Sequence, residues 1–175
     1  MIEHLKSFNL PQWIAANRHL SGTKRCIWEN SDFWAFVTWG PNERTVFHVN
    51  PGDEMFQQLE GQMELHYRRE DGAIQVTVLE PGDLFLLPAG VPHSPRREAG
   101  SWTLVVTPRR TPDAQERWIW YCDNCHAELY EVGITGRRMG KPVDVLAEAT
   151  SALKESAKLR TCLQCGHCSV IQTGQ

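Results

Sequence analysis

The sequence contains no apolar run that approaches the roughly 18 residues of a membrane-spanning helix, so a membrane protein is not expected. Residues 1–6 lack the apolar core of a signal peptide, and this favours the cytoplasm. Strong charge of either sign is also missing, because the formal net charge is −3 over 175 residues. The sequence therefore predicts neither a nucleic-acid partner nor binding to an anionic membrane surface.

The six cysteines do not have the distribution of a disulfide framework. Four of them form two Cys-x-x-Cys pairs, Cys122 with Cys125 and Cys162 with Cys165. In a chain that is not exported, this spacing indicates a metal site. Four thiolates suit tetrahedral Zn²⁺ or an iron ion, and ligand softness alone does not choose between them. Such a site has no open coordination position, so we expect it to fold and hold the C-terminal segment.

Short apolar or alternating segments, separated by turns rich in Gly and Pro, dominate the first two thirds of the chain. They predict strands at residues 25–28, 33–38, 45–49, 54–59, 63–67, 74–78, 84–87 and 102–107. Gly61 predicts a hairpin between the fourth and fifth of these. Many short strands without a long helical pattern favour a closed antiparallel barrel or jelly roll.

Helical patterns stand at the two ends. Pro11, near the start of a Trp/Ile/Ala pattern, predicts a short helix at residues 10–17. The composition shifts after Pro108, and residues 143–159 repeat their apolar side chains at close to 3.6 residues, which predicts one amphipathic helix. We expect residues 1–110 to form the barrel with the N-terminal helix. Residues 111–175 then form a C-terminal extension with the Cys₄ metal site and one helix.

Two histidines and one carboxylate, His48, Glu54 and His93, lie in or beside the predicted strands. If these strands belong to one barrel, the three side chains can converge on one metal ion. Two imidazoles and a carboxylate leave half of an octahedron empty. A mononuclear Fe(II) ion with adjacent open positions can hold both an organic chelate and O₂, so oxygen chemistry is the leading expectation.

The spacing around these three residues resembles the two motifs of the cupin superfamily. The matching positions are His48-x-Asn50-x-x-x-Glu54 with Gly61, and Gly82-x5-Pro88-x-Gly90-x-x-His93. Many cupins have a second histidine at the place of Asn50, so the resemblance implies three protein ligands here. The implied fold is an all-β double-stranded β-helix, that is, a jelly-roll barrel.

The wider pattern resembles the 3-hydroxyanthranilate 3,4-dioxygenase family. It consists of Gly40-Pro41-Asn42-x-Arg44-Thr45-x-Phe47-His48, Glu54-x-Phe56-x-Gln58-Leu59-x-Gly61, Gly82-Asp83-Leu84-Phe85-Leu86-Leu87-Pro88 and Pro92-His93-Ser94-Pro95-x-Arg97. The two cysteine pairs, the first preceded by Trp120-Tyr121, resemble the rubredoxin-like tail of the bacterial form. The resemblance extends from about Trp13 to Cys165.

This resemblance implies a non-haem Fe(II) ring-cleaving dioxygenase that inserts both atoms of O₂ into 3-hydroxyanthranilate. It assigns the iron to His48, Glu54 and His93. It assigns the substrate carboxylate to Arg44 and Arg97, which is sensible because a guanidinium pairs bidentately with a planar carboxylate. It also implies a homodimer, a role in tryptophan (kynurenine) catabolism and a product that closes to quinolinate.

The chain departs from the family at three pocket positions. Thr107 stands in place of a glutamate on the last barrel strand, Lys24 in place of Asn, and Val46 in place of Asp. Thr107 cannot act as a general base at neutral pH. Lys24 either favours a second anionic substituent on the substrate or points to solvent.

We therefore expect Arg44, Arg97 and Thr107 to be catalytic, and Lys24 to join them in contacting the substrate. Two alternatives remain open. The first is a paralogue with shifted specificity for another amino-hydroxybenzoate or a catechol carboxylate. The second is a barrel without enzymatic activity that binds an aromatic acid.

Overall fold

The computed structural model describes residues 7–20, 24–28, 31–135 and 142–172, and the segment 1–6 used for the export prediction lies outside them. The strands are β1 (Lys24–Trp28), β2 (Phe33–Trp39), β3 (Val46–Val49), β4 (Glu54–Glu60), β5 (Met63–Arg68), β6 (Ile74–Leu79), β7 (Leu84–Leu87), β8 (His93–Arg97), β9 (Trp102–Pro108), β10 (Gln115–Tyr121) and β11 (Glu128–Thr135). The helices are α1 (Leu10–Asn17), α2 (Pro142–Glu155) and α3 (Ala157–Arg160). In this described part of the chain, no helix has the length and apolarity needed to cross a membrane.

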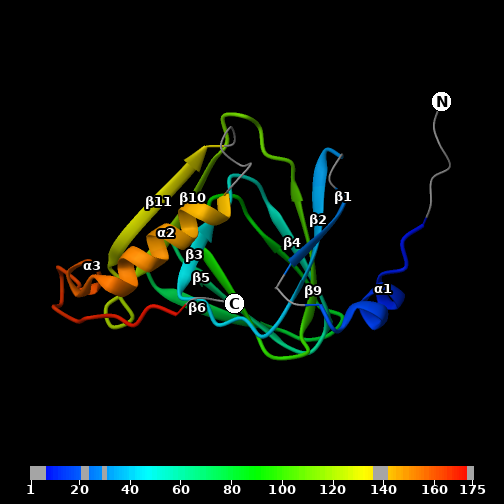
Figure 1. The fold of residues 1–175 in the computed structure, drawn as a ribbon, viewed down its shortest axis with the longest axis horizontal. Helices are drawn as coiled ribbons and strands as arrows, with labels where there is room; N and C mark the ends of the chain where they lie inside the picture. The colour runs from blue at the N-terminus through cyan, green and yellow to red at the C-terminus, as the bar shows by residue number, and fades with distance from the viewer. Residues whose placement is uncertain (1–6, 21–23, 29–30, 136–141, 173–175) are drawn as a thin grey trace.

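The strands form two antiparallel sheets that pack against each other (Figure 1). One has the order β1-β2-β9-β4-β7 and the other β11-β10-β3-β8-β5-β6. Phe56 and Val105 of the first sheet pack against Met63 and Leu65 of the second, so the core lies between the sheets. In β5, Met63 and Leu65 are buried while Glu64 between them is exposed, as the alternation of a half-buried strand requires. The predicted all-β barrel is confirmed.

The N-terminal helix is also confirmed at its predicted bounds. Asn9 caps α1 by accepting a hydrogen bond from the backbone N–H of Gln12, and Pro11 lies in its first turn. Ile14 packs with Trp39 and Trp102 of the five-stranded sheet. The helix therefore covers this sheet at the end of the molecule opposite α2 and α3 (Figure 1).

The turn at Gly61 does not make the predicted hairpin. The strand β4 pairs with β7 and β9, whereas β5 pairs with β6 and β8, so the chain passes from one sheet to the other at this turn. Gly61 has a φ of +60°, and a Cβ atom there would lie 2.9 Å from the Cα atom of Ser101. Both the backbone conformation and the lack of space require glycine. The hairpin prediction is wrong because a turn signal does not specify the partner of the next strand.

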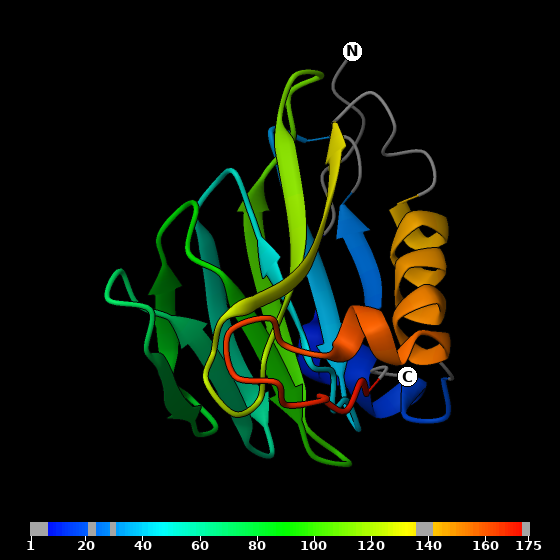
Figure 2. The ribbon, with the colours of Figure 1, turned by 90° about the vertical axis from the view of Figure 1, so that its left-hand side faces the viewer.

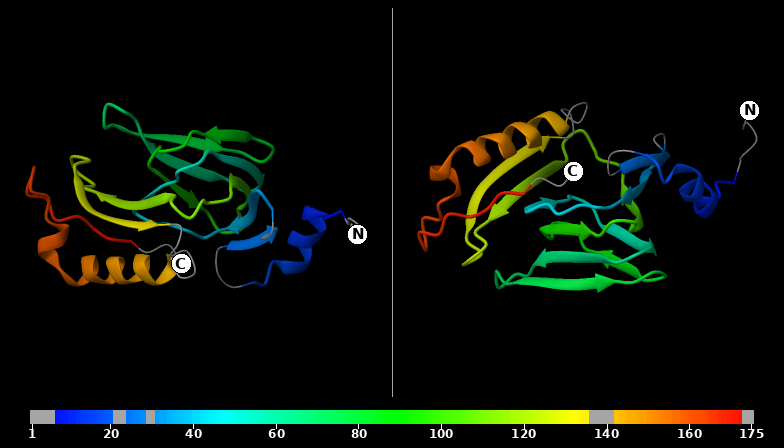
Figure 3. Two further views of the ribbon diagram at one scale, coloured as in Figure 1. Left: turned by 90° about the horizontal axis from the view of Figure 1, so that it is seen from above. Right: turned by 60° about the horizontal axis from the view of Figure 1, so that its bottom comes forward.

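The first two strands of the C-terminal part, β10 and β11, still belong to the six-stranded sheet of the barrel. The strand β10 pairs with β3, and Trp118 stands opposite His48 in this pairing. The helix α2 packs on the face of β10 and β11 that carries Trp118 and Trp120 (Figure 3). The predicted division near residue 110 falls between β9 and β10, so the two parts share the six-stranded sheet. That division remains a prediction.

The predicted helix at residues 143–159 is present as two helices. Ser156 ends α2 and begins α3, because its side chain accepts a hydrogen bond from the backbone N–H of Leu159. The segment after α3 then runs beside the loop between β10 and β11 (Figure 2). This arrangement brings the two cysteine pairs together.

Candidate active site

His48, Glu54 and His93 meet inside the barrel. His48 and His93 are directly opposite in the β3–β8 pair, so both side chains project from the same face of the sheet, with ring centroids 5.3 Å apart. Glu54 begins β4 in the facing sheet. One nitrogen or carboxylate oxygen from each residue lies within 4.8 Å of those from the other two. The three residues therefore form a compact cluster of possible metal ligands.

The protonation pattern of this cluster favours a cation at its centre. The Nδ1 atom of His93 lies 3.1 Å from the carbonyl oxygen of Val91, so Nδ1–H donates there and Nε2 keeps its lone pair. That lone pair is 2.7 Å from Oε2 of Glu54. Glu54 Oε2 and His48 Nε2 are both buried and have no hydrogen-bond partner among the described residues. A divalent metal ion would satisfy these atoms, so the donor set fits one.

The ionisation of the cluster also suits metal binding. Burial alone would raise the pKa of Glu54, but His93 and then His48 outweigh it and hold the pKa below its ordinary value. Burial lowers the pKa of His48. At neutral pH these shifts keep Glu54 as a carboxylate and His48 as a neutral imidazole, which are the forms that bind metals.

Arg44 and Arg97 line the same cavity. Burial lowers the pKa of Arg44 to about 10, and burial followed by the charge of Arg44 lowers that of Arg97 to about 9, so both are protonated at neutral pH. Arg97 Nε donates to the hydroxyl of Thr103, which donates to Gln58, and this fixes the guanidinium. Arg44 Nε is buried and has no hydrogen-bond partner among the described residues. The two cations thus form a buried site suited to an anion.

The cavity that joins these groups has a volume of about 300 Å³, which suits one small ring. Besides the charged groups, its walls are Trp34, Phe36, Thr38, Asn42, Phe56, Pro95, Val105, Trp118 and Leu146. Lys24 also lines it, with Nζ 4.7 Å from the centroid of the Phe36 ring. The chain therefore combines a candidate metal cluster, cations and aromatic surfaces in one cavity.

Thr107 lies outside the set of residues that line this cavity. Its buried hydroxyl accepts hydrogen bonds from Asn50 Nδ2 at 3.1 Å and from Arg110 at 3.0 Å. Asn50 also accepts from the backbone N–H of Gly52, so it stabilises the turn before β4. Val46 packs with Trp118 and Trp120 in the core beneath α2. Thr107 and Val46 therefore contact residues that line the cavity, without lining it themselves.

Sequence reasoning missed Trp118 and Glu116, which the β3–β10 pairing brings to the cluster, and Arg110, which forms an ion pair with Glu116. Trp118 stacks on His48 with ring centroids 5.1 Å apart and an interplanar angle of 24°. Glu116 is buried, with Oε2 3.5 Å from Nε2 of His48, and Arg110 forms an ion pair with it. Burial would raise the pKa of Glu116, but His48 and Arg110 outweigh it and lower the pKa. The alternation of residues 116, 118 and 120 on one strand face was the available signal.

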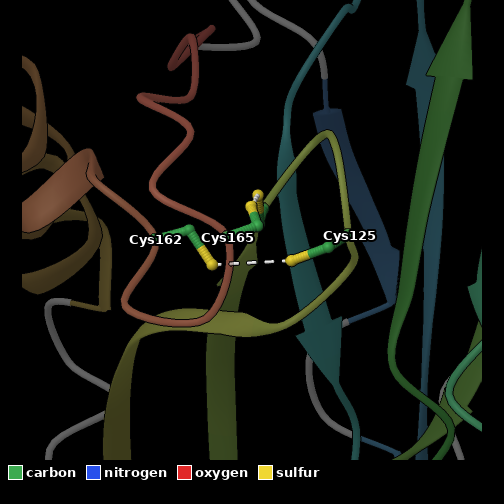
Figure 4. Close-up of side chains that lie close together, drawn as sticks. Cys125, Cys162 and Cys165 are labelled. Carbon is green, nitrogen blue, oxygen red and sulfur yellow. Dashed lines mark hydrogen bonds between the residues drawn. The ribbon is translucent and has the colours of Figure 1, made fainter.

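The two cysteine pairs also converge. Figure 4 shows Cys125 on the loop between β10 and β11, and Cys162 and Cys165 after α3, with the thiols of Cys125 and Cys162 turned toward each other. The sulfur atoms of Cys125 and Cys162 are 3.5 Å apart, those of Cys122 and Cys165 are 3.6 Å apart, and none forms a disulfide. All four lie within 4.8 Å of one another. This spacing fits four thiolate ligands around one metal ion.

Comparison with known sequences gives a consistent result. The family model for 3-hydroxyanthranilic acid dioxygenase matches residues 1–149. A Bacillus thuringiensis protein named 3-hydroxyanthranilate 3,4-dioxygenase is 36% identical over 178 residues, covering 100% of this chain and 98% of the relative. A Xanthomonas campestris protein of the same name is 38% identical and covers 91% of this chain and 89% of its own. A Neurospora crassa protein of that name is 35% identical, with 90% and 87% covered.

Solved structures resemble the barrel at low sequence identity. A Bacillus halodurans protein has a TM-score of 0.50 at 17% identity, covering 64% of this chain and 87% of its own. A cupin-2 domain protein from Shewanella frigidimarina has a TM-score of 0.48 at 21% identity, with 58% and 94% covered. The first of these similarities concerns the fold alone. With the two antiparallel sheets, it agrees with an all-β jelly-roll barrel.

Proposed function

Because the chain belongs to the 3-hydroxyanthranilic acid dioxygenase family of ring-opening dioxygenases, we propose that it cleaves 3-hydroxyanthranilate in an Fe(II)-dependent, extradiol-type reaction that inserts both atoms of O₂. The observation that carries the proposal is the meeting, in one cavity, of the His48, Glu54 and His93 cluster with two buried guanidinium groups. The cluster provides metal ligands and the guanidinium groups provide an anion site. Neither group alone would select an aromatic acid.

We assign Fe(II) to His48, Glu54 and His93, and iron or zinc to the four cysteines. A ferrous ion held by these residues would supply the chemistry that brings O₂ to react with an electron-rich ring. The stacking of Trp118 on His48 restrains the imidazole, and the His93 contact with Val91 fixes its tautomer. These contacts keep the ligand atoms aimed at one point before any substrate enters.

The chain's own residues then bind and orient the substrate. Arg44 and Arg97 pair with the ring carboxylate and so fix which ring edge faces the cluster. The aromatic side chains of Trp34 and Phe36 contact the faces and edges of the ring. Leu146 and Trp118 exclude water, which strengthens each ion pair inside the cavity.

A related amino-hydroxybenzoate or catechol carboxylate is the second candidate substrate. The position of Lys24 on the cavity wall favours it, because its ammonium group adds a cation beyond the two arginines. We propose that Lys24 contacts a second electron-rich or anionic substituent. Thr107, which bonds Asn50 and Arg110, supports the site without reaching the ring.

Oxygen consumption by the purified, Fe(II)-loaded protein tests the proposal. The panel contains 3-hydroxyanthranilate, other amino-hydroxybenzoates and catechol carboxylates. We expect stoichiometric uptake of O₂ with ring opening, and both oxygen atoms of labelled O₂ in the product. Faster turnover of another ring acid would establish the second candidate. Ring-acid binding without oxygen uptake in iron-loaded protein would instead support a non-enzymatic binding barrel.

We also propose that the chain forms a homodimer. Leu84 and Leu86 of β7 are 66% and 62% exposed, and Val76 and Val78 of β6 are also exposed. Both strands lie at sheet edges, where unpaired backbone groups favour association. Sedimentation equilibrium of the wild type and of Leu84→Lys with Leu86→Lys tests this, since the double substitution should give a monomer. An unchanged mass would contradict the proposed interface.

A further inference from the structure

The cavity holds a second buried carboxylate, Glu116, which the cluster of possible metal ligands does not include. Glu116 lies two residues before Trp118, whose partner across the β3–β10 pair is His48. Because side chains two residues apart share one face of a strand, Glu116 enters the cavity beside the cluster. Only 6% of its surface is exposed. A carboxylate in such a position needs partners or a ligand.

Arg110 fixes one oxygen atom of this carboxylate. Its Nε donates to Glu116 Oε1, and its terminal nitrogen donates to the Thr107 hydroxyl at 3.0 Å and to the Pro108 carbonyl oxygen at 2.7 Å. The guanidinium also lies 5.4 Å from the centroid of the Trp34 ring. Arg110 is therefore held at several points, and the plane of the Glu116 carboxylate is held with it.

The other oxygen, Oε2, faces His48. It lies 3.5 Å from Nε2 of His48, and this nitrogen is buried and has no hydrogen-bond partner among the described residues. If Nε2 held a metal ion, it would carry no hydrogen to donate to Oε2. A ligand that brings an N–H or O–H group to this oxygen would then give it a hydrogen bond.

The charges along the cavity place Glu116 away from the anion site. Glu54 acts on Arg44 and Arg97 and also on Lys24 and His48, whereas Glu116 acts on Lys24 and His48 without appearing among the charges that shift the two arginines. A ring whose carboxylate reaches the arginines therefore extends other substituents toward the part of the cavity that Glu116 lines. The two charged regions can therefore bind different groups of one ligand: the arginines bind an anion, and Glu116 accepts a hydrogen bond from a donor.

We propose that Glu116 Oε2 is a substrate contact that accepts a hydrogen bond from an N–H or O–H group on the ring of the bound aromatic acid. Arg110 and Thr107 act through it as positioning residues. The inference rests on the proposed function, because it takes the cavity to be the ring-acid site. It assigns the selection of donor-bearing rings to β10, a strand of the predicted C-terminal extension.

Anaerobic binding to the Fe(II)-loaded full-length protein tests this without turnover. Trp34 and Trp118 line the cavity, so quenching of tryptophan fluorescence reports binding. The probes are 3-hydroxyanthranilate and benzoate, which keeps the carboxylate but has no ring donor. The variants are Glu116→Gln and, as a matched control, Glu131→Gln, which removes an ion pair with Arg117 outside the cavity.

We expect Glu116→Gln to weaken binding of 3-hydroxyanthranilate roughly 10- to 100-fold and to leave benzoate binding and iron content unchanged. Glu131→Gln should match the wild type. An unchanged ratio of the two affinities in Glu116→Gln would overturn the proposal. Loss of iron with an unchanged ratio would overturn it as well, since Glu116 would then act only through His48.

Further variants cover misfolding and the positioning roles. If Glu116→Gln does not fold, Glu116→Leu combined with Arg110→Leu removes both charges, and the same fall in the affinity ratio is expected. Thr107→Val should partly lower the affinity for 3-hydroxyanthranilate relative to that for benzoate, while Thr107→Ser, which keeps the hydroxyl, should have the wild-type ratio of affinities. If Thr107→Val has the same ratio as the wild type, Thr107 is not a positioning residue. Oxygen uptake is measured separately, so absence of turnover counts against the proposed function and not against the Glu116 contact.

Discussion

The two candidate metal centres are built in opposite ways. His48, Glu54 and His93 come from three strands of two facing sheets and lie inside the barrel. The four cysteines come from two loops, and Cys165 is exposed. The barrel cluster faces a cavity, so a metal ion held there would keep open positions, whereas four thiolates would close a tetrahedral site. Rigid strands thus carry the candidate open centre, and loops carry the candidate closed one.

The cysteine cluster is nevertheless connected to the cavity beside His48, Glu54 and His93. The cysteines tie the loop after β10 to the segment after α3, and Ser169 and Val170 of that segment donate hydrogen bonds to Asp123. The strand β10 supplies Glu116 and Trp118 to the cavity, and α2 supplies Leu146. The cysteine cluster therefore joins the segments next to β10 and α2, which supply one wall of the cavity. Four substitutions test this division of labour.

His93→Ala has the largest expected effect. It removes a ligand from the open centre, so we expect loss of barrel iron and at least about a 1,000-fold fall in oxygen consumption. His66→Ala is the matched control, because His66 lies on β5, the strand that pairs with β8, and contacts Glu64 instead of the cluster. Metal analysis and oxygen uptake check both variants. Equal iron content and rate in His93→Ala and the control would contradict the assigned centre.

Arg97→Met should rank second. It removes one guanidinium of the anion site, so we expect KM to rise roughly 100-fold with a smaller change in kcat. Arg97→Lys should not restore the wild-type KM, because an ammonium group lacks the bidentate fork. Arg18→Met, which removes an exposed ion pair with Glu60, is the control. If Arg97→Lys behaves like the wild type, the bidentate role is incorrect.

The candidate ligands of the open centre were easier to predict from the sequence than the other residues of the cavity. The candidate ligand positions His48, Glu54 and His93 stand beside strong turn signals, and all eight predicted strands begin and end within one residue of the observed bounds. The strand β8 was not predicted, because Pro95 and two arginines are poor strand signals. It exists because both of its neighbours, β3 and β5, pair with it.

The wall of the cavity could not be read in the same way. Glu116 and Trp118 reach His48 only through the β3–β10 register, which joins segments about 70 residues apart in sequence. The departure at Thr107 was visible, but its hydroxyl contacts with Asn50 and Arg110 depend on tertiary packing. Local patterns therefore located the candidate ligands, whereas long-range pairing decided which further carboxylate lines the cavity.

Cys162→Ser should affect stability more than chemistry. Loss of a closed metal site removes its binding free energy from the folded state, about 4 kcal/mol when the metal is 1,000-fold above its dissociation constant. We expect a lower Tm, a fall in activity of about 10-fold or less, and iron retained in the barrel. Cys168→Ser, an exposed cysteine outside the cluster, should match the wild type. Complete loss of barrel iron in Cys162→Ser would show that the two centres do not form independently.

Leu146→Ala should have the smallest effect and tests the link between the two regions most directly. Leu146 of α2 is partly buried, packs against the core between this helix and the sheet, and also lines the cavity. Its truncation should cost about 1–2 kcal/mol of unfolding free energy and raise KM roughly threefold, because water admitted to the cavity screens the ion pairs with the substrate. Leu163→Ala, at a fully exposed side chain, is the control and should change neither quantity. If stability falls while KM stays constant, α2 only packs against the sheet; if both change, the helix tied to the cysteine site is part of the wall that keeps the reactive cavity dry.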